Sequence, residues 1–133
     1  MSFSIGHVAL TVSDIEQTIQ FYSDCFGFVK SEEFFISEKN LTISFIEKEG
    51  VVLELFSFSD TEPLPKYREE LDSDLKTIGT KHLAFTVDNI NVFYEKLKRM
   101  NIKFAVNISE FENGKKYFYI KDPDGILVEV MET

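Results

Sequence analysis

The chain contains an internal repeat, and this repeat limits the folds that it can adopt more than any other feature. When the sequence is shifted by 75 positions, residues 7–12 (HVALTV) align with residues 82–87 (HLAFTV). Four of these six positions are identical, and the other two are apolar in both copies. The same shift aligns residues 50–55 (GVVLEL) with residues 125–130 (GILVEV), with no insertion between the two blocks. The period is too long and the copies too few for a solenoid, so the repeat predicts two copies of one larger module.

The aligned blocks predict modules at residues 1–56 and 79–133, joined by a linker at residues 57–78. Alternating apolar residues predict strands, and apolar residues three or four apart predict one helix after the first strand of each module. The predicted strands cover residues 4–12, 28–36, 40–48 and 50–57 in the first module and 80–87, 102–110, 115–121 and 125–132 in the second. This order, βαβββ twice, predicts the α+β class. Because 133 residues are too few for two ordinary domains, we expect residues 1–133 to form one domain made of both modules.

Each predicted helix has recognisable ends. Residues 13–16 (SDIE) match a capping box at the start of the first helix, and Gly27 can end it in a left-handed conformation. In the second module Asp88 is predicted to cap the helix, and Asn113-Gly114 predicts a two-residue hairpin turn. The apolar stripes of the two helices consist of Ile15, Ile19, Tyr22 and Phe26 in the first module and Ile90, Phe93, Tyr94 and Leu97 in the second.

The charge balance disfavours several classes of partner. The chain has 14 basic and 23 acidic residues, and this net charge of −9 disfavours nucleic acid and anionic membranes. Its one cysteine, Cys25, cannot form an internal disulfide and is predicted to be a small core residue. No apolar run is long enough for a membrane span, and the first residues do not match a secretory signal. We therefore expect a cytoplasmic protein.

The chain's two histidines, His7 and His82, occupy equivalent positions of the repeat, and so do Glu54 and Glu129. Strand alternation places each histidine on the face away from the apolar, helix-facing residues, among small side chains that leave room for a cavity. The glutamates project from otherwise apolar strands, where a buried carboxylate needs a partner. Each residue taken alone is more often an ordinary core or surface residue. Four of them at matching repeat positions favour a metal site instead.

Two neutral imidazoles and two carboxylates would balance the charge of one divalent cation. Nitrogen and oxygen ligands suit zinc, nickel, cobalt, manganese and iron. Four protein ligands on an octahedral ion leave two positions for substrate oxygens, and such an ion can act as a Lewis acid. The residues therefore predict a metal site at which a small molecule binds.

Five segments carry a family resemblance: residues 6–12 (GHVALTV), 21–28 (FYSDCFGF), 52–56 (VLELF), 81–87 (KHLAFTV) and 122–130 (DPDGILVEV). With these segments the chain resembles the vicinal oxygen chelate superfamily of glyoxalases, bleomycin-resistance proteins and dioxygenases, over nearly its whole length. The resemblance implies that the βαβββ modules form curved half-barrel sheets around a metal-binding cavity. It also implies a homodimer that acts on a small-molecule substrate.

The ligand pattern is similar to that of glyoxalase I, lactoylglutathione lyase. By that resemblance His7, Glu54, His82 and Glu129 bind a divalent metal, with nickel or zinc preferred and cobalt, manganese or iron as alternatives. It implies a lyase or isomerase that moves a proton through a metal-bound enediolate on a small α-hydroxycarbonyl compound or thiol adduct. By analogy Glu129 is the catalytic base, and Glu54 is a ligand that can also act as acid or base.

The resemblance leaves alternatives open. An acyl-CoA epimerase, an extradiol dioxygenase and a non-catalytic drug-binding protein share the expected fold. Thr11 and Phe58 stand where glyoxalase I has an arginine and an asparagine that hold glutathione, so glutathione itself is not implied. The last hairpin carries three lysines that either bind an anionic tail of the substrate or line a solvated face: Lys115, Lys116 and Lys121. The linker is either a solvated connection or a lid.

Overall fold

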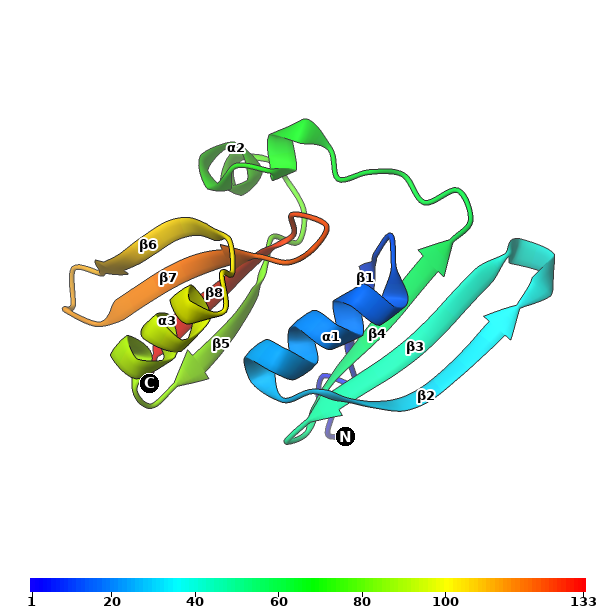
Figure 1. Cartoon of the computed structure of the whole chain (residues 1–133), viewed down its shortest axis with the longest axis horizontal. Coiled ribbons are helices and arrows are strands. Elements are labelled where there is room, and N and C mark those ends of the chain that lie inside the picture. Colours follow the sequence, from blue (N-terminus) through cyan, green and yellow to red (C-terminus); the bar gives the residue numbers. More distant parts are fainter. The chain divides into compact units, whose positions relative to one another are not determined.

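The first half of the chain folds as the predicted βαβββ module. A computed structural model describes residues 1–133, and their contacts divide the chain into two units, residues 1–63 and 64–133 (Figure 1). The elements of the first unit are β1 (Val8–Thr11), α1 (Ile15–Phe26), β2 (Val29–Ile36), the short 3-10 helix η1 (Ser37–Lys39), β3 (Leu41–Lys48) and β4 (Val51–Phe58). The four strands form one open, curved sheet in the order β1-β4-β3-β2, in which only the β1–β4 pair is parallel.

Helix α1 covers one face of this sheet (Figure 1). Tyr22 and Cys25 on α1 are buried, as are Leu53 and Leu55 on β4, so the core lies between helix and sheet and Cys25 belongs to it. Because side chains alternate along a strand, Glu54 lies on the opposite face of the sheet from these leucines. The apolar pattern of β4 therefore decides which face carries the carboxylate.

The second unit repeats this plan after the linker. Its elements are η2 (Lys66–Arg68), α2 (Leu71–Lys76), β5 (Leu83–Val87), α3 (Ile90–Arg99), β6 (Phe104–Glu110), β7 (Lys116–Lys121) and β8 (Leu127–Glu132). The sheet order is β5-β8-β7-β6, and again only the pair of the first and last strands is parallel. Leu97 of α3 and Val128 and Val130 of β8 are fully buried. The α+β class and the βαβββ order are confirmed, whereas the grouping of residues 1–133 into one domain stays a prediction.

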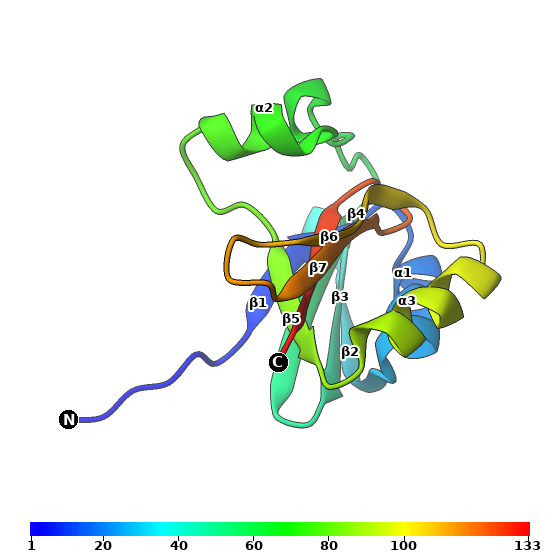
Figure 2. The same ribbon diagram turned by 90° about the vertical axis from the view of Figure 1, so that its left-hand side faces the viewer.

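Two strand starts were predicted too early. Strand β1 begins at Val8, where its pairing with β4 begins, instead of at residue 4. The residues before it run as an extended tail with no strand partner (Figure 2), and Phe3 and Ile5 are exposed. Strand β5 likewise begins at Leu83 instead of residue 80. In both cases the alternation of apolar residues starts before the first residue that pairs with the neighbouring strand. The pattern alone therefore overestimates the length of these strands.

Two local predictions are corrected by the backbone. Asn89, not Asp88, caps α3, and its side chain accepts a hydrogen bond from the backbone N–H of Val92 at 3.2 Å. Strand β6 ends at Glu110 and β7 begins at Lys116, so the hairpin turn is longer than Asn113-Gly114. The predicted end of α1 is confirmed, because Gly27 has a φ of 79° in the left-handed region.

The linker carries more structure than a solvated connection. It contains η2 and α2, and its Asp74 side chain is buried. None of the helices combines the length and the apolar character needed to cross a membrane.

Candidate functional site

The first unit brings His7 and Glu54 into contact. His7 directly precedes β1, and Glu54 lies in the middle of β4, opposite Ala9 in the parallel register. The distance between His7 Nε2 and Glu54 Oε1 is 3.1 Å. Phe45 on β3 lies opposite Glu54, and its ring meets the imidazole edge to face at a centroid distance of 6.0 Å. Three neighbouring strands thus hold this histidine–glutamate pair.

The second unit builds the same pair from the equivalent residues. The distance between His82 Nε2 and Glu129 Oε2 is also 3.1 Å, and Glu129 lies opposite Ala84 in the parallel register of β5 and β8. Tyr119 on β7 takes the place that Phe45 has in the first unit, opposite the glutamate. Its ring centroid lies 5.0 Å from that of His82, and its hydroxyl lies 3.4 Å from His82 Nε2.

The two pairs differ in their exposure to solvent. The His7 side chain is 46% exposed, against 15% for His82, and Glu129 is 9% exposed. A carboxylate as buried as Glu129 is costly without a positive partner, and no lysine or arginine makes an ion pair with it. Burial raises the pKa of the Tyr119 hydroxyl, and the negative charge of Glu129 and a hydrogen bond to it raise the pKa further. The environment of Glu129 therefore favours a bound cation.

The residues fit a divalent metal. Each pair offers one imidazole nitrogen and one carboxylate oxygen, which are ligands that zinc, nickel and related ions accept. Two ligand atoms about 2.1 Å from one ion and at right angles to each other lie about 3.0 Å apart, close to the 3.1 Å seen in both pairs. The Nδ1 atom of His82 is buried without a hydrogen-bond partner, so Nε2 is the ring atom directed at the carboxylate.

One pair alone does not make a metal site. No third histidine, cysteine, aspartate or glutamate joins either pair within its unit. Protein zinc sites use at least three protein ligands as a rule, so a metal centre requires both pairs. The structure brings each predicted histidine to its own glutamate, and the convergence of all four residues stays a prediction.

The sequence reasoning did not single out Tyr119. It divided Tyr117, Phe118 and Tyr119 between core and cavity without assigning the individual residues. In the structure Phe118 is fully buried beneath α3, and Tyr119 lies on the face of Glu129. The register of the β7–β8 hairpin identifies Tyr119, because the residue opposite Glu129 on the neighbouring strand lies on the same face of the sheet as Glu129.

Comparison with known proteins identifies relatives over nearly the whole chain. Residues 4–130 match the family model of the Glyoxalase/Bleomycin resistance protein/Dioxygenase superfamily. The chain is 30% identical to the uncharacterised protein YaeR of Escherichia coli, over 96% of the chain and 95% of that protein. It is 27% identical to human mitochondrial methylmalonyl-CoA epimerase, over 97% of the chain and 73% of that protein. It is 21% identical to lactoylglutathione lyase of Schizosaccharomyces pombe, over 98% of the chain and 47% of that protein.

A solved structure agrees with the fold. The glyoxalase family protein from Enterococcus faecalis superimposes with a TM-score of 0.83 at 28% identity, covering 97% of both chains. The similarity therefore extends over both βαβββ units of the chain. The chain belongs to the glyoxalase/bleomycin resistance/dioxygenase, or vicinal oxygen chelate, superfamily.

Proposed function

We propose that the chain is a glyoxalase I-like, metal-dependent lyase or isomerase. Its substrate class is a small α-hydroxycarbonyl compound or thiol adduct, in which a proton moves between carbons next to a carbonyl. The observation that carries this proposal is the duplicated pair, His7–Glu54 and His82–Glu129, with 3.1 Å between nitrogen and oxygen in each unit.

The four residues of the two pairs would hold the divalent metal, for which nickel or zinc is preferred. When bound, such an ion supplies Lewis-acid chemistry worth several kcal/mol to the negative charge that develops on a carbonyl oxygen. The imidazoles of His7 and His82 act as neutral ligands, so that the two carboxylates balance the charge of the ion. Because one pair comes from each unit, both units are required for activity.

Glu129 is the residue that we propose as the base. Its carboxylate removes a proton from the carbon beside the carbonyl and returns it to the neighbouring carbon. The low exposure of Glu129 supports this role, since little water competes for the carboxylate. Glu54, which is more exposed, acts as a ligand and as a second acid or base.

Tyr119 assists by holding Glu129 and His82 in position. Its hydroxyl lies 3.4 Å from His82 Nε2. Burial and the charge of Glu129 raise the pKa of this hydroxyl, so it keeps its proton at neutral pH and donates a hydrogen bond to the site. The first unit has Phe45 at this place and offers no such donor. This asymmetry supports Glu129 over Glu54 as the base.

A second candidate is an acyl-CoA epimerase, which moves a proton beside a thioester carbonyl. The similarity to methylmalonyl-CoA epimerase over nearly the whole chain supports it. The two candidates share the base and the ligands and differ in the group attached to the reacting carbons. Exchange of the substrate proton with deuterium oxide therefore tests the shared chemistry, and the choice of substrate separates the candidates.

The proposal includes a homodimer and a cytoplasmic location. Two ligands per unit leave open whether the pairs meet within one chain or across a dimer, and a dimer allows either arrangement. Cys25 is buried and forms no disulfide, which is compatible with a reducing compartment. Light scattering at several protein concentrations measures the assembly.

Metal analysis of the purified protein tests the proposed function. Wild type loaded with nickel or zinc is expected to retain about one ion for each set of four proposed ligands. His82→Ala and Glu129→Gln are expected to lose most of the bound metal. Glu112→Gln, a change in the exposed loop between β6 and β7, serves as the control and keeps the metal. Turnover of methylglyoxal with glutathione is measured beside deuterium exchange into an acyl-CoA thioester. Wild-type protein that retains no divalent metal after loading overturns the proposal.

A further inference from the structure

His82 stands just outside its sheet. The pairing of β5 with β8 begins at Leu83, opposite Val128, so strand pairing holds the residue after His82 and none before it. The His82 side chain is nevertheless only 15% exposed and lies 3.1 Å from Glu129. Because chain ends without further contacts fray, another part of the protein has to hold the backbone that leads into β5.

The imidazole of His82 has few contacts of its own that fix its direction. A histidine that binds a metal usually donates a hydrogen bond from its second ring nitrogen to a carbonyl or carboxylate, and this bond orients the ring. Nδ1 of His82 is buried without such a partner. Its ring contacts Tyr119 at a centroid distance of 5.0 Å. The direction of the imidazole therefore depends strongly on where the backbone of residue 82 is held.

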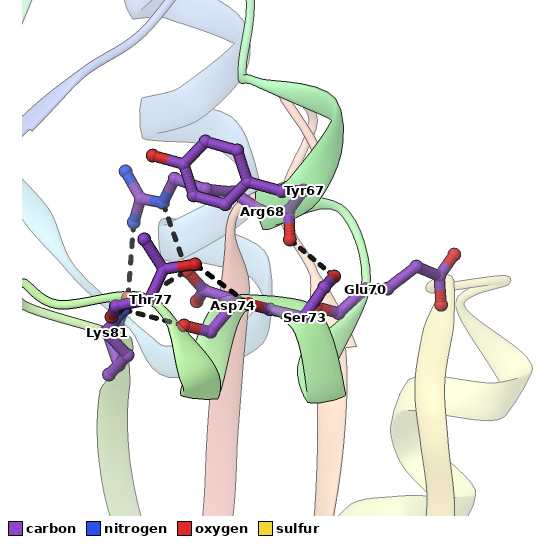
Figure 3. Close-up of polar contacts among 7 residues, drawn as sticks. All are labelled: Tyr67, Arg68, Glu70, Ser73, Asp74, Thr77 and Lys81. Carbon is purple, nitrogen blue, oxygen red and sulfur yellow. Dashed lines mark hydrogen bonds and ion pairs between the residues drawn. The ribbon is translucent and has the colours of Figure 1, made fainter.

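The linker anchors this backbone through Lys81, the residue directly before His82 (Figure 3). The ammonium of Lys81 donates hydrogen bonds to the carbonyl of Asp74, at 2.7 Å, and to the carbonyl of Thr77, and it lies 3.6 Å from Asp74 Oδ1. An ammonium has three N–H donors, and these three acceptors use all of them. The two carbonyls belong to the C-terminal end of α2, where a lysine also stabilises the helix end.

Arg68 on η2 holds Lys81 from a second side (Figure 3). Its guanidinium donates a hydrogen bond to the backbone carbonyl of Lys81 at 3.3 Å, and its Nε lies 3.4 Å from Asp74 Oδ1. Asp74 is 2% exposed, and a carboxylate so deeply buried is costly without the two cations beside it. Both the side chain and the backbone carbonyl of Lys81 are therefore fixed.

The linker is itself anchored to the second unit. The hydroxyl of Ser73 donates a hydrogen bond to the carbonyl of Tyr67 at 2.6 Å, which joins η2 to α2 (Figure 3). Nearer its start, Cδ2 of Leu64 lies 3.6 Å from the point at which a Cβ on Gly125 would stand, directly before β8. Because β5 and β8 are parallel, they begin at the same edge of the sheet. The linker thus connects the starts of the two strands that carry the second histidine–glutamate pair.

The first unit has no such anchor. The repeat places Gly6 where the second unit has Lys81. Residues 1–6 run as an extended tail (Figure 2), and apart from its chain neighbours no heavy atom lies within 4 Å of the point at which a Cβ on Gly6 would stand. His7 is much more exposed than His82. Of two equivalent pairs, the one with the anchor is therefore the more buried.

We propose that Asp74, Arg68 and Lys81 form a positioning network for His82. The network fixes the backbone ahead of β5 and thereby holds the imidazole against Glu129 before a metal binds. Asp74 and Arg68 act through Lys81, and Lys81 acts through the peptide bond that joins it to His82. That His82 is a metal ligand rests on the proposed function, whereas the restraint on its ring does not.

NMR of the metal-free, full chain tests the restraint, because the two histidines of the chain give two sets of imidazole signals. Wild type is expected to show a nuclear Overhauser effect between the rings of His82 and Tyr119, the ring contact of the second unit. It is also expected to show one between the rings of His7 and Phe45, the ring contact of the first unit. The contact of the first unit serves as an internal reference for every variant.

The main variants remove one charge of the network each. Asp74→Asn removes the buried negative charge, and Lys81→Met removes the ammonium and keeps an unbranched side chain. Both are expected to lose the ring contact of the second unit and to keep that of the first. Asp72→Asn makes the same chemical change at an exposed position of α2 and is expected to keep both contacts.

A further variant keeps the test decisive if Asp74→Asn does not fold. Arg68→Lys keeps a cation beside Asp74 and removes the guanidinium that binds the Lys81 carbonyl, and it is expected to weaken the ring contact of the second unit. A network that only stabilises the fold would lower the Tm and leave this contact unchanged in the folded protein. Retention of the contact in both Lys81→Met and Arg68→Lys overturns the proposal.

Metal titration of the same proteins tests the consequence for the proposed function. Lys81→Met retains all four proposed ligands and is expected to bind nickel or zinc about tenfold more weakly than wild type, as metal sites do when a group that orients a ligand is lost. Wild-type affinity in Lys81→Met overturns the positioning role and leaves the proposed function intact. Absence of metal uptake by wild type overturns the proposed function, and the ring contact then decides alone whether the network holds His82.

Discussion

Asp122, in the turn before β8, is a buried carboxylate outside the candidate site. Its Oδ1 accepts hydrogen bonds from the backbone N–H groups of Asp124 and Ile126, each at 2.9 Å, while Oδ2 is buried without a partner. Burial raises the pKa of Asp122 from 3.8 to about 6, although the backbone hydrogen bonds act in the opposite direction. The folded protein therefore holds this proton more tightly than the unfolded chain does.

The raised pKa predicts a pH-dependent loss of stability. The protonated carboxyl stabilises the folded state below pH 3.8, and this contribution is lost as the pH rises through about 6. Asp122→Asn keeps the accepting Oδ1 and removes the charge. Relative to wild type, the variant is expected to gain about 3 kcal/mol between about pH 3.5 and pH 7, at about 1.4 kcal/mol per pKa unit. Urea unfolding of both proteins across this range measures the difference, and parallel pH curves contradict the prediction.

Tyr119 offers a test of the candidate site that leaves the proposed metal ligands intact. Tyr119→Phe removes only the hydroxyl near His82 and Glu129. The variant then has a phenylalanine opposite Glu129, as the first unit has Phe45 opposite Glu54. We expect kcat to fall about tenfold, the effect of one hydrogen bond that orients the base, with metal content unchanged. Tyr117→Phe, whose ring stacks on Phe111 instead, is the matched control. An unchanged kcat in Tyr119→Phe shows that the hydroxyl takes no part.

At the scale of single elements, the start of α3 shows how a cap depends on backbone conformation. Asn89 has non-helical dihedral angles (φ −129°, ψ 84°), and its side chain accepts a hydrogen bond from the Val92 N–H, whereas Asp88 accepts one from the Thr133 hydroxyl. Both residue types are good caps, so composition cannot choose between them. The repeat contains the answer, because the shift of 75 aligns Asn89 with Asp14, the cap of α1.

This cap can be measured by substitution. Asn89→Ala is expected to lower the free energy of unfolding by about 1 kcal/mol, the usual effect of losing a side-chain cap. Asp88→Ala loses only an exposed contact with the last residue of the chain and is expected to lower it by less than about half of that. If both variants lost the same free energy of unfolding, the assignment of Asn89 rather than Asp88 as the cap would be contradicted. Thermal unfolding monitored by circular dichroism resolves the difference.

Elements with strong periodicity could be predicted from the sequence, and contacts between distant residues could not. Alternating apolar residues and the repeat predicted the strands around Glu54 and Glu129 and grouped both glutamates with the two histidines, whereas the individual contacts His7–Glu54 and His82–Glu129 came from the structure. The buried Asp74 was not predicted, because its partners Arg68 and Lys81 are chosen by tertiary contacts and a charged stretch is usually solvated. The place of Tyr119 depends on how many residues the turn before β8 contains, which the apolar pattern does not specify.

For the whole molecule, the central expectation is that both units contribute to one metal centre. A metal that binds only the folded protein raises its stability by about 2.7 kcal/mol at a hundredfold excess over Kd. We therefore expect nickel or zinc to raise the Tm of wild type but not of His7→Ala or His82→Ala. Because these two residues belong to different units, loss of the shift in both variants demonstrates a shared site. A shift that persists in either variant contradicts it.

In each unit the proposed ligands sit on the strands that lie first and last in the chain, β1 with β4 and β5 with β8. A nascent chain therefore carries both histidines long before Glu129 has been synthesised. Until β8 joins β5, the second pair does not exist, and the chain has no complete set of the proposed ligands. An ion that needs all four proposed ligands could therefore load only after β8 has been synthesised, and fragments cut before residue 127 would be unable to sequester it.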